Sequence, residues 1–173
     1  MSEPDEAARA LLAALGARGW SLAVAESLTG GLVVATIVSV PGASAVLRGG
    51  VVAYATDLKH SLLGVDADLL ARYGAVHPDV ARQMAEGVRA TAGRDGVPAH
   101  VGIATTGVAG PDPQDGQAVG TVFIAVATPV ETRVERLALD GDRAEIRAAA
   151  VREALRLARE CVEVADAAEE ASV

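Results

Sequence analysis

The 173-residue sequence has few of the residues on which cross-links and metal sites are usually built. Its single cysteine, Cys161, cannot form an internal disulfide, and its cysteine and histidine residues lack the spacing of a zinc site. We therefore expect a protein of the reducing cytoplasm. Aromatic residues make up only 2% of the chain, so its core must be packed from alanine, valine, leucine and isoleucine.

The chain also lacks an excess of basic charge. Fifteen lysine and arginine residues are outnumbered by 23 aspartate and glutamate residues, which gives a net charge of −8. A general nucleic-acid binder needs a basic face, so no nucleic-acid partner is expected, although a local basic pocket stays open. Residues 1–6 are acidic, unlike a signal peptide, and the longest apolar stretch, 32–40, is shorter than the ~20 residues that span a bilayer. No membrane partner is expected either.

Lysine and asparagine are the most depleted polar residues. Asparagine does not occur, and Lys59 is the only lysine beside fourteen arginines. A genome bias toward arginine would replace an ordinary surface lysine, whereas a lysine that must lose its proton cannot be replaced, because arginine stays protonated. Lys59 is therefore a candidate base, with survival by chance as the open alternative.

Hydrophobic periodicity and turn residues predict one domain over residues 1–173, with frayed ends at 1–4 and 166–173. We expect an α/β fold, a three-layer α/β/α sandwich with a mixed, partly antiparallel sheet. The predicted helices are 5–18, 32–38, short pieces within 57–73, 78–91 and 142–162. The predicted strands are 21–25, 49–54 (buried on both faces), 99–104, and a hairpin of 121–127 and 132–139.

The first candidate site is the turn that contains Ser27. A serine between an apolar strand and a helix lies where backbone N–H groups stabilise negative charge, which suits a nucleophile and its oxyanion. We expect N–H groups around Thr29, Gly30 and Gly31 to bind that oxyanion, and the two glycines to allow close approach of a substrate. The open alternative is a helix N-cap by Ser27 or Thr29.

The second candidate combines Tyr54, at the end of a predicted strand, with Lys59 near the start of the next helix. Burial and a helix N-terminus both disfavour the ammonium form of a lysine, so we expect an uncharged amine that serves as a general base. Tyr54 is a candidate proton relay. Alternatively, Tyr54 is a core aromatic and Lys59 a solvated charge beside Asp57.

Two further segments carry groups that bind anions. Thr105, Thr106 and Gly107 combine hydroxyl and N–H groups after a predicted strand, and Arg143 suits a bidentate contact with a phosphate. The open alternatives are that the threonine segment is only a crossover loop and that Arg143 is an ordinary surface arginine. The sequence has no phosphate-binding P-loop, no dinucleotide-binding glycine motif and no G-x-S-x-G elbow. A Ser–Lys pair is therefore the simplest catalytic use of these residues, with no metal site expected.

An ordered set of motifs lies between residues 25 and 143, within a longer segment, 11–157, that carries the same resemblance. The set comprises AESLTGG at 25–31, VPGAS at 40–44, GGVVAY at 49–54 followed by Lys59, LLGV at 62–65, GAV at 74–76, TGVAGP at 106–111, GTV at 120–122 and GDR at 141–143. It resembles the CinA C-terminal domain family, also called the PncC family of nicotinamide-nucleotide amidohydrolases. Leu28, Ala55 and His77 depart from the residues common at their positions, which affects fine specificity more than the reaction.

The resemblance implies an α/β/α sandwich that hydrolyses nicotinamide mononucleotide to nicotinate mononucleotide and ammonia, with no metal or other cofactor. It implies a nucleotide substrate as the partner, a homo-oligomer, and the form of the enzyme that stands alone. Ser27 would be the nucleophile, Lys59 its base and Tyr54 a proton relay. Two alternatives stay open: a nucleotide-binding regulatory module without turnover, and an amidase of another small amide.

Overall fold

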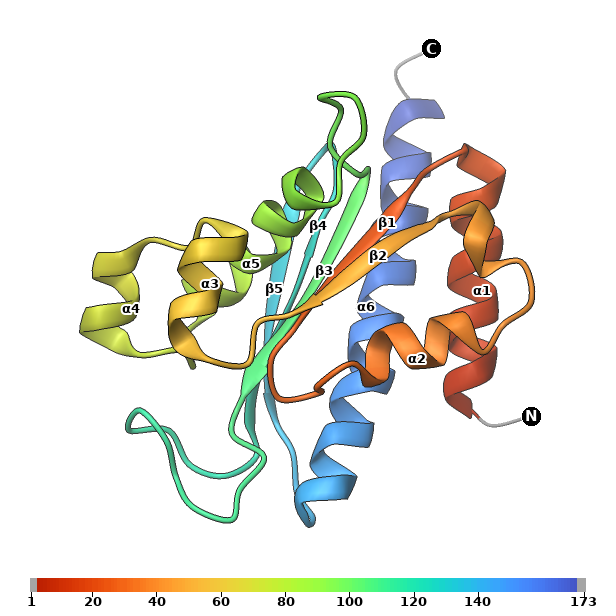
Figure 1. Ribbon diagram of the computed structural model, residues 1–173. Coiled ribbons are helices and arrows are strands. Elements are labelled where there is room, and N and C mark those ends of the chain that lie inside the picture. Colours follow the sequence, from red (N-terminus) through yellow and green to blue (C-terminus); the bar gives the residue numbers. More distant parts are fainter. Residues whose placement is uncertain (1–2, 171–173) are drawn as a thin grey trace.

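The computed structural model describes residues 3–170 as an alternation of helices and strands (Figure 1). The elements are α1 (Glu3–Arg18), β1 (Leu22–Glu26), α2 (Leu32–Val38), the 3-10 turn η1 (Ala43–Ala45), β2 (Leu47–Val52), α3 (Thr56–Leu63), α4 (Ala67–Tyr73), α5 (Pro78–Thr91), β3 (Val101–Gly107), β4 (Thr121–Ala127), β5 (Thr132–Ala138) and α6 (Arg143–Glu170). The helices and strands expected from sequence are all present, and their ends coincide with the prediction or differ from it by a few residues. The exception is the C-terminal end of α6, which lies eight residues past its predicted end.

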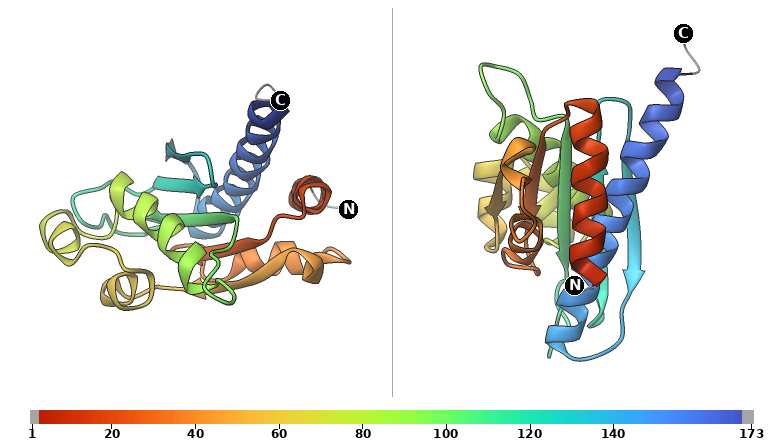
Figure 2. Two further views of the ribbon diagram at one scale, coloured as in Figure 1. Left: turned by 90° about the horizontal axis from the view of Figure 1, so that it is seen from above. Right: turned by 90° about the vertical axis from the view of Figure 1, so that its right-hand side faces the viewer.

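The described strands form one mixed sheet in the order β2-β1-β3-β4-β5. Strand β1 pairs in parallel with β2 and β3, whereas β4 is antiparallel to both β3 and β5. The hairpin expected for the last two strands is confirmed. Helices cover both faces of this sheet, so the predicted α/β/α sandwich is confirmed as well (Figure 2).

Two apolar clusters separate the helices into these outer layers. One cluster joins α1, α2 and α6 to the sheet, and the other joins α3, α4 and α5 to its opposite face. The predicted stripe of Val80, Met84 and Val88 is fully buried in the second cluster. Both clusters consist largely of alanine, valine, leucine and isoleucine, as the scarcity of aromatic residues requires.

Strand β2 corrects one sequence expectation. It was expected to be buried on both faces over 49–54, but it is an edge strand over Leu47–Val52 whose residues alternate between partly buried and exposed. Among the described strands only β1 pairs with it, so the other long edge of β2 has no strand beside it. Tyr54 therefore follows the strand by two residues instead of ending it.

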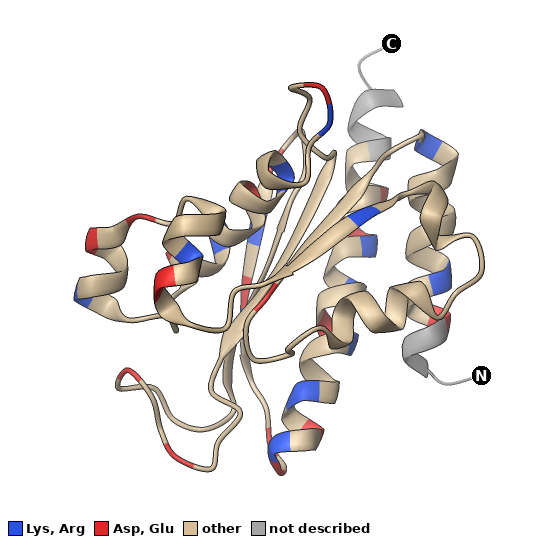
Figure 3. Cartoon of the chain, viewed as in Figure 1, with Lys and Arg blue, Asp and Glu red and all other residues tan. Residues whose placement is uncertain are grey.

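The described part of the chain begins and ends in helices, and most of its charged residues lie outside the central strands. Of the termini expected to fray, residues 1–2 and 171–173 lie outside the described residues, whereas 3–4 begin α1 and 166–170 complete α6. Charged residues lie on the helices, on loops and on the outer strands β2 and β5 (Figure 3). Glu26 is the one charged residue within β1, β3 and β4. In the described part of the chain, none of the helices has the length and apolar character of a membrane span.

The chain path creates a reversal of strand order at β1. From β1 the chain passes through α2 to β2 on one side, and then through α3, α4 and α5 to β3 on the other side. In open α/β sheets, ligands bind outside the carboxyl ends of strands at such a reversal. Ser27 directly follows β1, Thr106 lies near the end of β3, and Lys59 lies in α3, the helix that follows β2.

Close packing of α5 on α3 depends on Gly87. A Cβ atom at this position would lie 1.8 Å from the carbonyl oxygen of Leu63, the last residue of α3. No side chain fits without separation of the two helices, and α3 is the helix that carries Lys59.

We expect Gly87→Ala to lower the free energy of unfolding by about 1–3 kcal/mol, because its methyl group would overpack against α3. Urea denaturation measures this change. Gly16→Ala is the matched control, since a Cβ there meets nothing within 4 Å and alanine stabilises a helix by about 0.5–1 kcal/mol relative to glycine. Equal stability of the two variants would contradict this account.

Candidate active site

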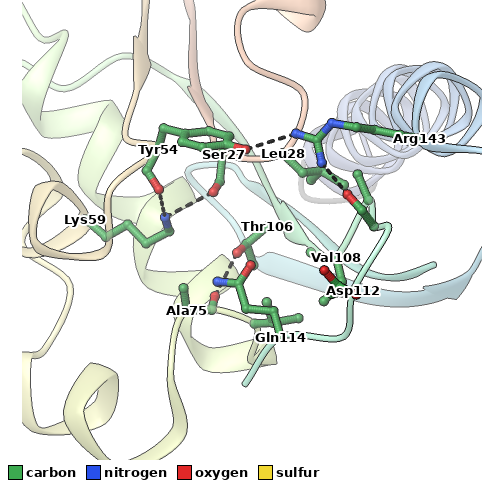
Figure 4. Close-up of a pocket in the computed structure, with 14 residues that line it drawn as sticks. Ser27, Leu28, Tyr54, Lys59, Ala75, Thr106, Val108, Asp112, Gln114 and Arg143 are labelled. Carbon is green, nitrogen blue, oxygen red and sulfur yellow. Dashed lines mark hydrogen bonds between the residues drawn. The ribbon is translucent and has the colours of Figure 1, made fainter. Parts of the chain in front are cut away.

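A cavity at the carboxyl end of the sheet brings together residues from five segments of the chain (Figure 4). Its walls come from the turn after β1, from α3 and the segment before it, from the α4–α5 connection, from the β3–β4 loop and from the start of α6. The predicted residues Ser27, Tyr54, Lys59, Thr106, Gly107 and Arg143 all line it. The fold therefore joins the two candidate sites that sequence spacing alone kept separate.

Glu26, which sequence reasoning missed, binds the N–H groups at the start of α2 that Ser27 or Thr29 was an alternative candidate to cap. The carboxylate of Glu26 is fully buried and accepts hydrogen bonds from the backbone N–H groups of Gly31 (2.9 Å), Val33 (3.1 Å) and Val34 (2.9 Å) at the start of α2. The alternative in which Ser27 or Thr29 caps this helix is therefore wrong. Ser27, 8% exposed, keeps its hydroxyl free for another partner.

That partner is the amine of Lys59. Lys59 is 0% exposed, and its Nζ lies 3.0 Å from Ser27 Oγ, 2.7 Å from the carbonyl oxygen of Ala53 and 3.4 Å from that of Tyr54. An ammonium group donates to all three oxygens. A neutral amine donates to the two carbonyls and keeps its lone pair for the Ser27 hydroxyl, so the same neighbours satisfy both protonation states. The interpretation of Lys59 as a solvated charge is wrong.

Burial changes the acidity of this amine. Desolvation lowers the pKa of Lys59 from 10.5 to about 8, and the negative charge of Asp115 opposes this shift. The direction matches the sequence expectation, but the expectation of an uncharged amine is corrected. With this pKa, about a tenth of the amines are neutral at pH 7, and the fraction rises as the pH passes through 8. A base in this range suits proton transfer near neutral pH.

Tyr54 occupies a different place from the one expected. Its side chain is 59% exposed, and its hydroxyl oxygen accepts a hydrogen bond from Arg143 Nη2 (3.0 Å). The Tyr54 atom that Lys59 contacts is the backbone carbonyl oxygen, so in this structure the predicted proton relay through the hydroxyl has no hydrogen-bonded path. Arg143 Nη1 also donates to the carbonyl oxygen of Gly110 (2.7 Å), so the guanidinium joins Tyr54 to the β3–β4 loop (Figure 4).

Four predicted binding residues do not line the cavity: Thr29 and Thr105, which are buried, and Gly30 and Gly31, which are exposed or partly exposed. The hydroxyls of Thr29 and Thr105 share a buried 2.7 Å hydrogen bond with each other. The N–H of Gly30 donates to the Ser27 carbonyl and that of Gly31 to Glu26. The prediction that these glycine N–H groups bind an oxyanion is therefore wrong, because both already have acceptors.

Asp115 is a second residue that sequence reasoning missed. It lies at the tip of the β3–β4 loop with φ 52°, and its Oδ2 accepts a hydrogen bond from the Ala75 N–H (2.8 Å). The Ala75 carbonyl oxygen accepts from Thr106 Oγ1 (2.7 Å), so the wall at Ala75 is held from both sides. The Asp-Gly pair was a visible turn signal, but its contact with a segment 40 residues away was not.

Comparison with known proteins places this geometry in a family. Residues 4–162 match the CinA C-terminal domain. The chain belongs to the CinA C-terminal domain family. This membership confirms the resemblance stated from the sequence motifs.

Relatives of the chain carry the same family name. It is 51% identical over 149 residues to a CinA-like protein of Frankia casuarinae, covering 86% of this chain and 33% of that protein. It is 48% identical over 158 residues to a CinA-like protein of an Anaeromyxobacter strain, covering 90% of this chain and 37% of that protein. The chain therefore spans about a third of the length of these curated relatives.

Solved structures match over nearly their whole length. The CinA superfamily protein of Klebsiella pneumoniae 700603 has a TM-score of 0.86 at 33% identity, covering 92% of this chain and 98% of that one. The competence damage-inducible protein A of another Klebsiella pneumoniae strain has a TM-score of 0.85 at 35% identity, covering 91% and 95%.

In the described residues there is no group of three or more His, Cys, Asp or Glu side chains that could hold a metal ion.

The pKa of Lys59 can be measured directly, because a chain with one lysine labelled at ¹³Cε gives a single lysine side-chain signal. We expect a titration midpoint near 8 in the wild type. Asp115→Asn should lower this midpoint, since it removes the negative charge that favours the ammonium form.

Asp95→Asn is the matched control, because Asp95 also precedes a glycine and has positive φ (54°), but lies in the α5–β3 loop. It should leave the midpoint unchanged. A wild-type midpoint above 10, or equal midpoints in all three proteins, would show that this description of Lys59 is incorrect.

Proposed function

We propose that the protein is an amidohydrolase that uses a Ser27–Lys59 dyad and converts nicotinamide mononucleotide to nicotinate mononucleotide and ammonia. The observation that carries the proposal is the 3.0 Å contact between the buried Lys59 amine and a serine hydroxyl that lines a cavity. A serine attacks a carboxamide only when a neighbouring base takes its proton. Lys59 is the basic side chain that contacts Ser27.

The acylation step follows from the contacts of the dyad. Neutral Lys59 accepts the proton of the Ser27 hydroxyl while Ser27 Oγ forms a bond to the carboxamide carbon. The resulting ammonium donates to the carbonyls of Ala53 and Tyr54, which are already in place. Lys59 then gives its proton to the amide nitrogen, the C–N bond breaks, and ammonia leaves.

Deacylation returns the enzyme to its starting state. A water molecule attacks the ester carbon, and neutral Lys59 accepts a proton from that water. The ester C–O bond breaks, the proton passes from Lys59 to Ser27 Oγ, and the product leaves as a carboxylic acid that ionises in water. The same amine thus acts as base and acid in each half of the reaction.

Leu28 is the best candidate for the oxyanion-binding donor. It lines the cavity, and in the described part of the chain its N–H has no protein acceptor. The N–H of the residue after a nucleophilic serine has this function in other hydrolases. It replaces the glycine N–H groups expected from sequence, which are already bonded.

Arg143 supports an anionic substrate. Its guanidinium lies at the cavity beside Tyr54 and carries a full positive charge with two neutral hydrogen-bond acceptors. A phosphate competes well for such a group, because charge-assisted bonds are about twice as strong as neutral ones. We therefore assign the phosphate of the nucleotide to Arg143, near Thr106 and Gly107.

Ser27→Ala and Lys59→Arg should each reduce ammonia release from nicotinamide mononucleotide to background, a loss of about a thousandfold or more. Alanine removes the nucleophile, and arginine stays protonated and cannot accept its proton. An enzyme-coupled ammonia assay measures both. Ser61→Ala, on the same helix as Lys59 but exposed, is the control and should keep full activity.

Calorimetry and the ammonia assay together distinguish the two alternatives, a regulatory module and an amidase of another compound. A regulatory module would bind the nucleotide in calorimetry, before and after Ser27→Ala, without ammonia release from the wild type. An amidase of another compound would release ammonia from a different member of a carboxamide panel and lose it in both variants.

Arg143→Met should raise KM for nicotinamide mononucleotide about 10- to 100-fold, because it removes a charge-assisted bond to the phosphate. The effect on the corresponding nucleoside, which lacks the phosphate, should be much smaller. Steady-state kinetics on both compounds measures the difference, with Arg152→Met on the same helix as control. Equal losses on the two compounds would argue against a phosphate contact.

A further inference from the structure

Arg147, on α6, makes direct contact with the turn that carries Ser27. Its Nε donates to the carbonyl oxygen of Leu28 (2.9 Å) and its Nη2 to that of Thr29 (3.0 Å). These residues are 118 and 119 positions apart in the sequence from Arg147. The guanidinium thus grips two consecutive peptide groups directly after the nucleophile.

The two carbonyl oxygens differ in whether they have a second hydrogen-bond donor. The Thr29 carbonyl also accepts from the Leu32 N–H (3.2 Å), whereas among the described residues the Leu28 carbonyl has Arg147 as its partner. Gly30 lies against the same guanidinium, since a Cβ there would be 3.5 Å from Arg147 Nη2. The glycine expected to admit substrate therefore lies next to Arg147.

Peptide planarity extends the effect of Arg147 to the N–H groups. In a trans peptide the carbonyl and the following N–H point in opposite directions, so fixing the Leu28 carbonyl toward α6 turns the Thr29 N–H away from α6. The Thr29 N–H, like that of Leu28, has no protein acceptor in the part of the chain described. A cationic donor on the carbonyl also polarises the peptide and strengthens its N–H as a donor.

We propose that Arg147 is a positioning residue that fixes the Leu28–Thr29 and Thr29–Gly30 peptide groups, and thereby holds in place the turn whose Leu28 N–H is the oxyanion-binding donor beside Ser27. This inference rests on the proposed amidohydrolase function. Arg147 contacts carbonyl oxygens of the turn and does not line the cavity, in contrast to Arg143. Its contribution should therefore appear in the chemical step and not in substrate affinity.

Three variants test this assignment in steady-state kinetics. Arg147→Met keeps the aliphatic stem but removes the donors, and should lower kcat about 10- to 100-fold with KM changed less than about threefold. Arg147→Lys keeps the charge but not the two-pronged fork, and should give an intermediate loss. Arg159→Met, on the same helix and paired with Glu163 at the surface, should match the wild type.

A second measurement does not depend on turnover. Hydrogen exchange of the Gly30 amide, which donates to the Ser27 carbonyl (3.1 Å), should be about tenfold or more faster in both Arg147 variants than in Arg159→Met. Unchanged kcat, or a loss confined to KM, together with unchanged Gly30 exchange would overturn the assignment. If Arg147→Met does not fold, Arg147→Lys decides by the same criteria. If the wild type hydrolyses no carboxamide, the proposed function fails, and Gly30 exchange still decides whether Arg147 fixes the turn.

Discussion

The ε-amine of Lys59 is enclosed by protein and hydrogen-bonded to three oxygen atoms. This arrangement depends on elements from several parts of the chain. A buried charge is tolerated only when its donors are satisfied. Here the segment after β2 supplies two carbonyls, the turn after β1 supplies the serine, and Gly87 lets α5 hold α3 close. The strand order, with β1 between β2 and β3, brings all of these together at the carboxyl ends of the strands.

Negative charge at the start of α2 is supplied by the protein itself. The three free N–H groups there bind Glu26, a buried carboxylate at the end of β1. The favourable field of the helix terminus therefore stabilises the turn rather than a substrate. As a result, Ser27 is positioned by the strand that precedes it and by its hydrogen bond to Thr105, and its hydroxyl is available to Lys59.

Local patterns predicted the elements well, and they identified three of the side chains that line the cavity. The single lysine, the serine between strand and helix, and the arginine after Asp142 all line the cavity. The predictions were less accurate for backbone N–H groups, whose hydrogen-bond acceptors the sequence does not show. Thr29, Gly30 and Gly31 were given to the oxyanion, but Glu26 and the turn itself occupy the glycine N–H groups, because a carboxylate on the preceding strand reaches them first.

The amino-acid sequence alone determined the α/β architecture, the alanine- and valine-rich core and the residue types available for chemistry, because periodicity and composition act over short distances along the chain. The tertiary structure decided that Ser27 and Lys59 meet, that the Tyr54 hydroxyl turns to Arg143, and that Asp115 acts on Lys59 from a loop. Each of these interactions joins segments that are distant in the sequence and that the fold brings together. The pKa of a buried amine depends on the groups that enclose it in the fold rather than on its neighbours in the sequence.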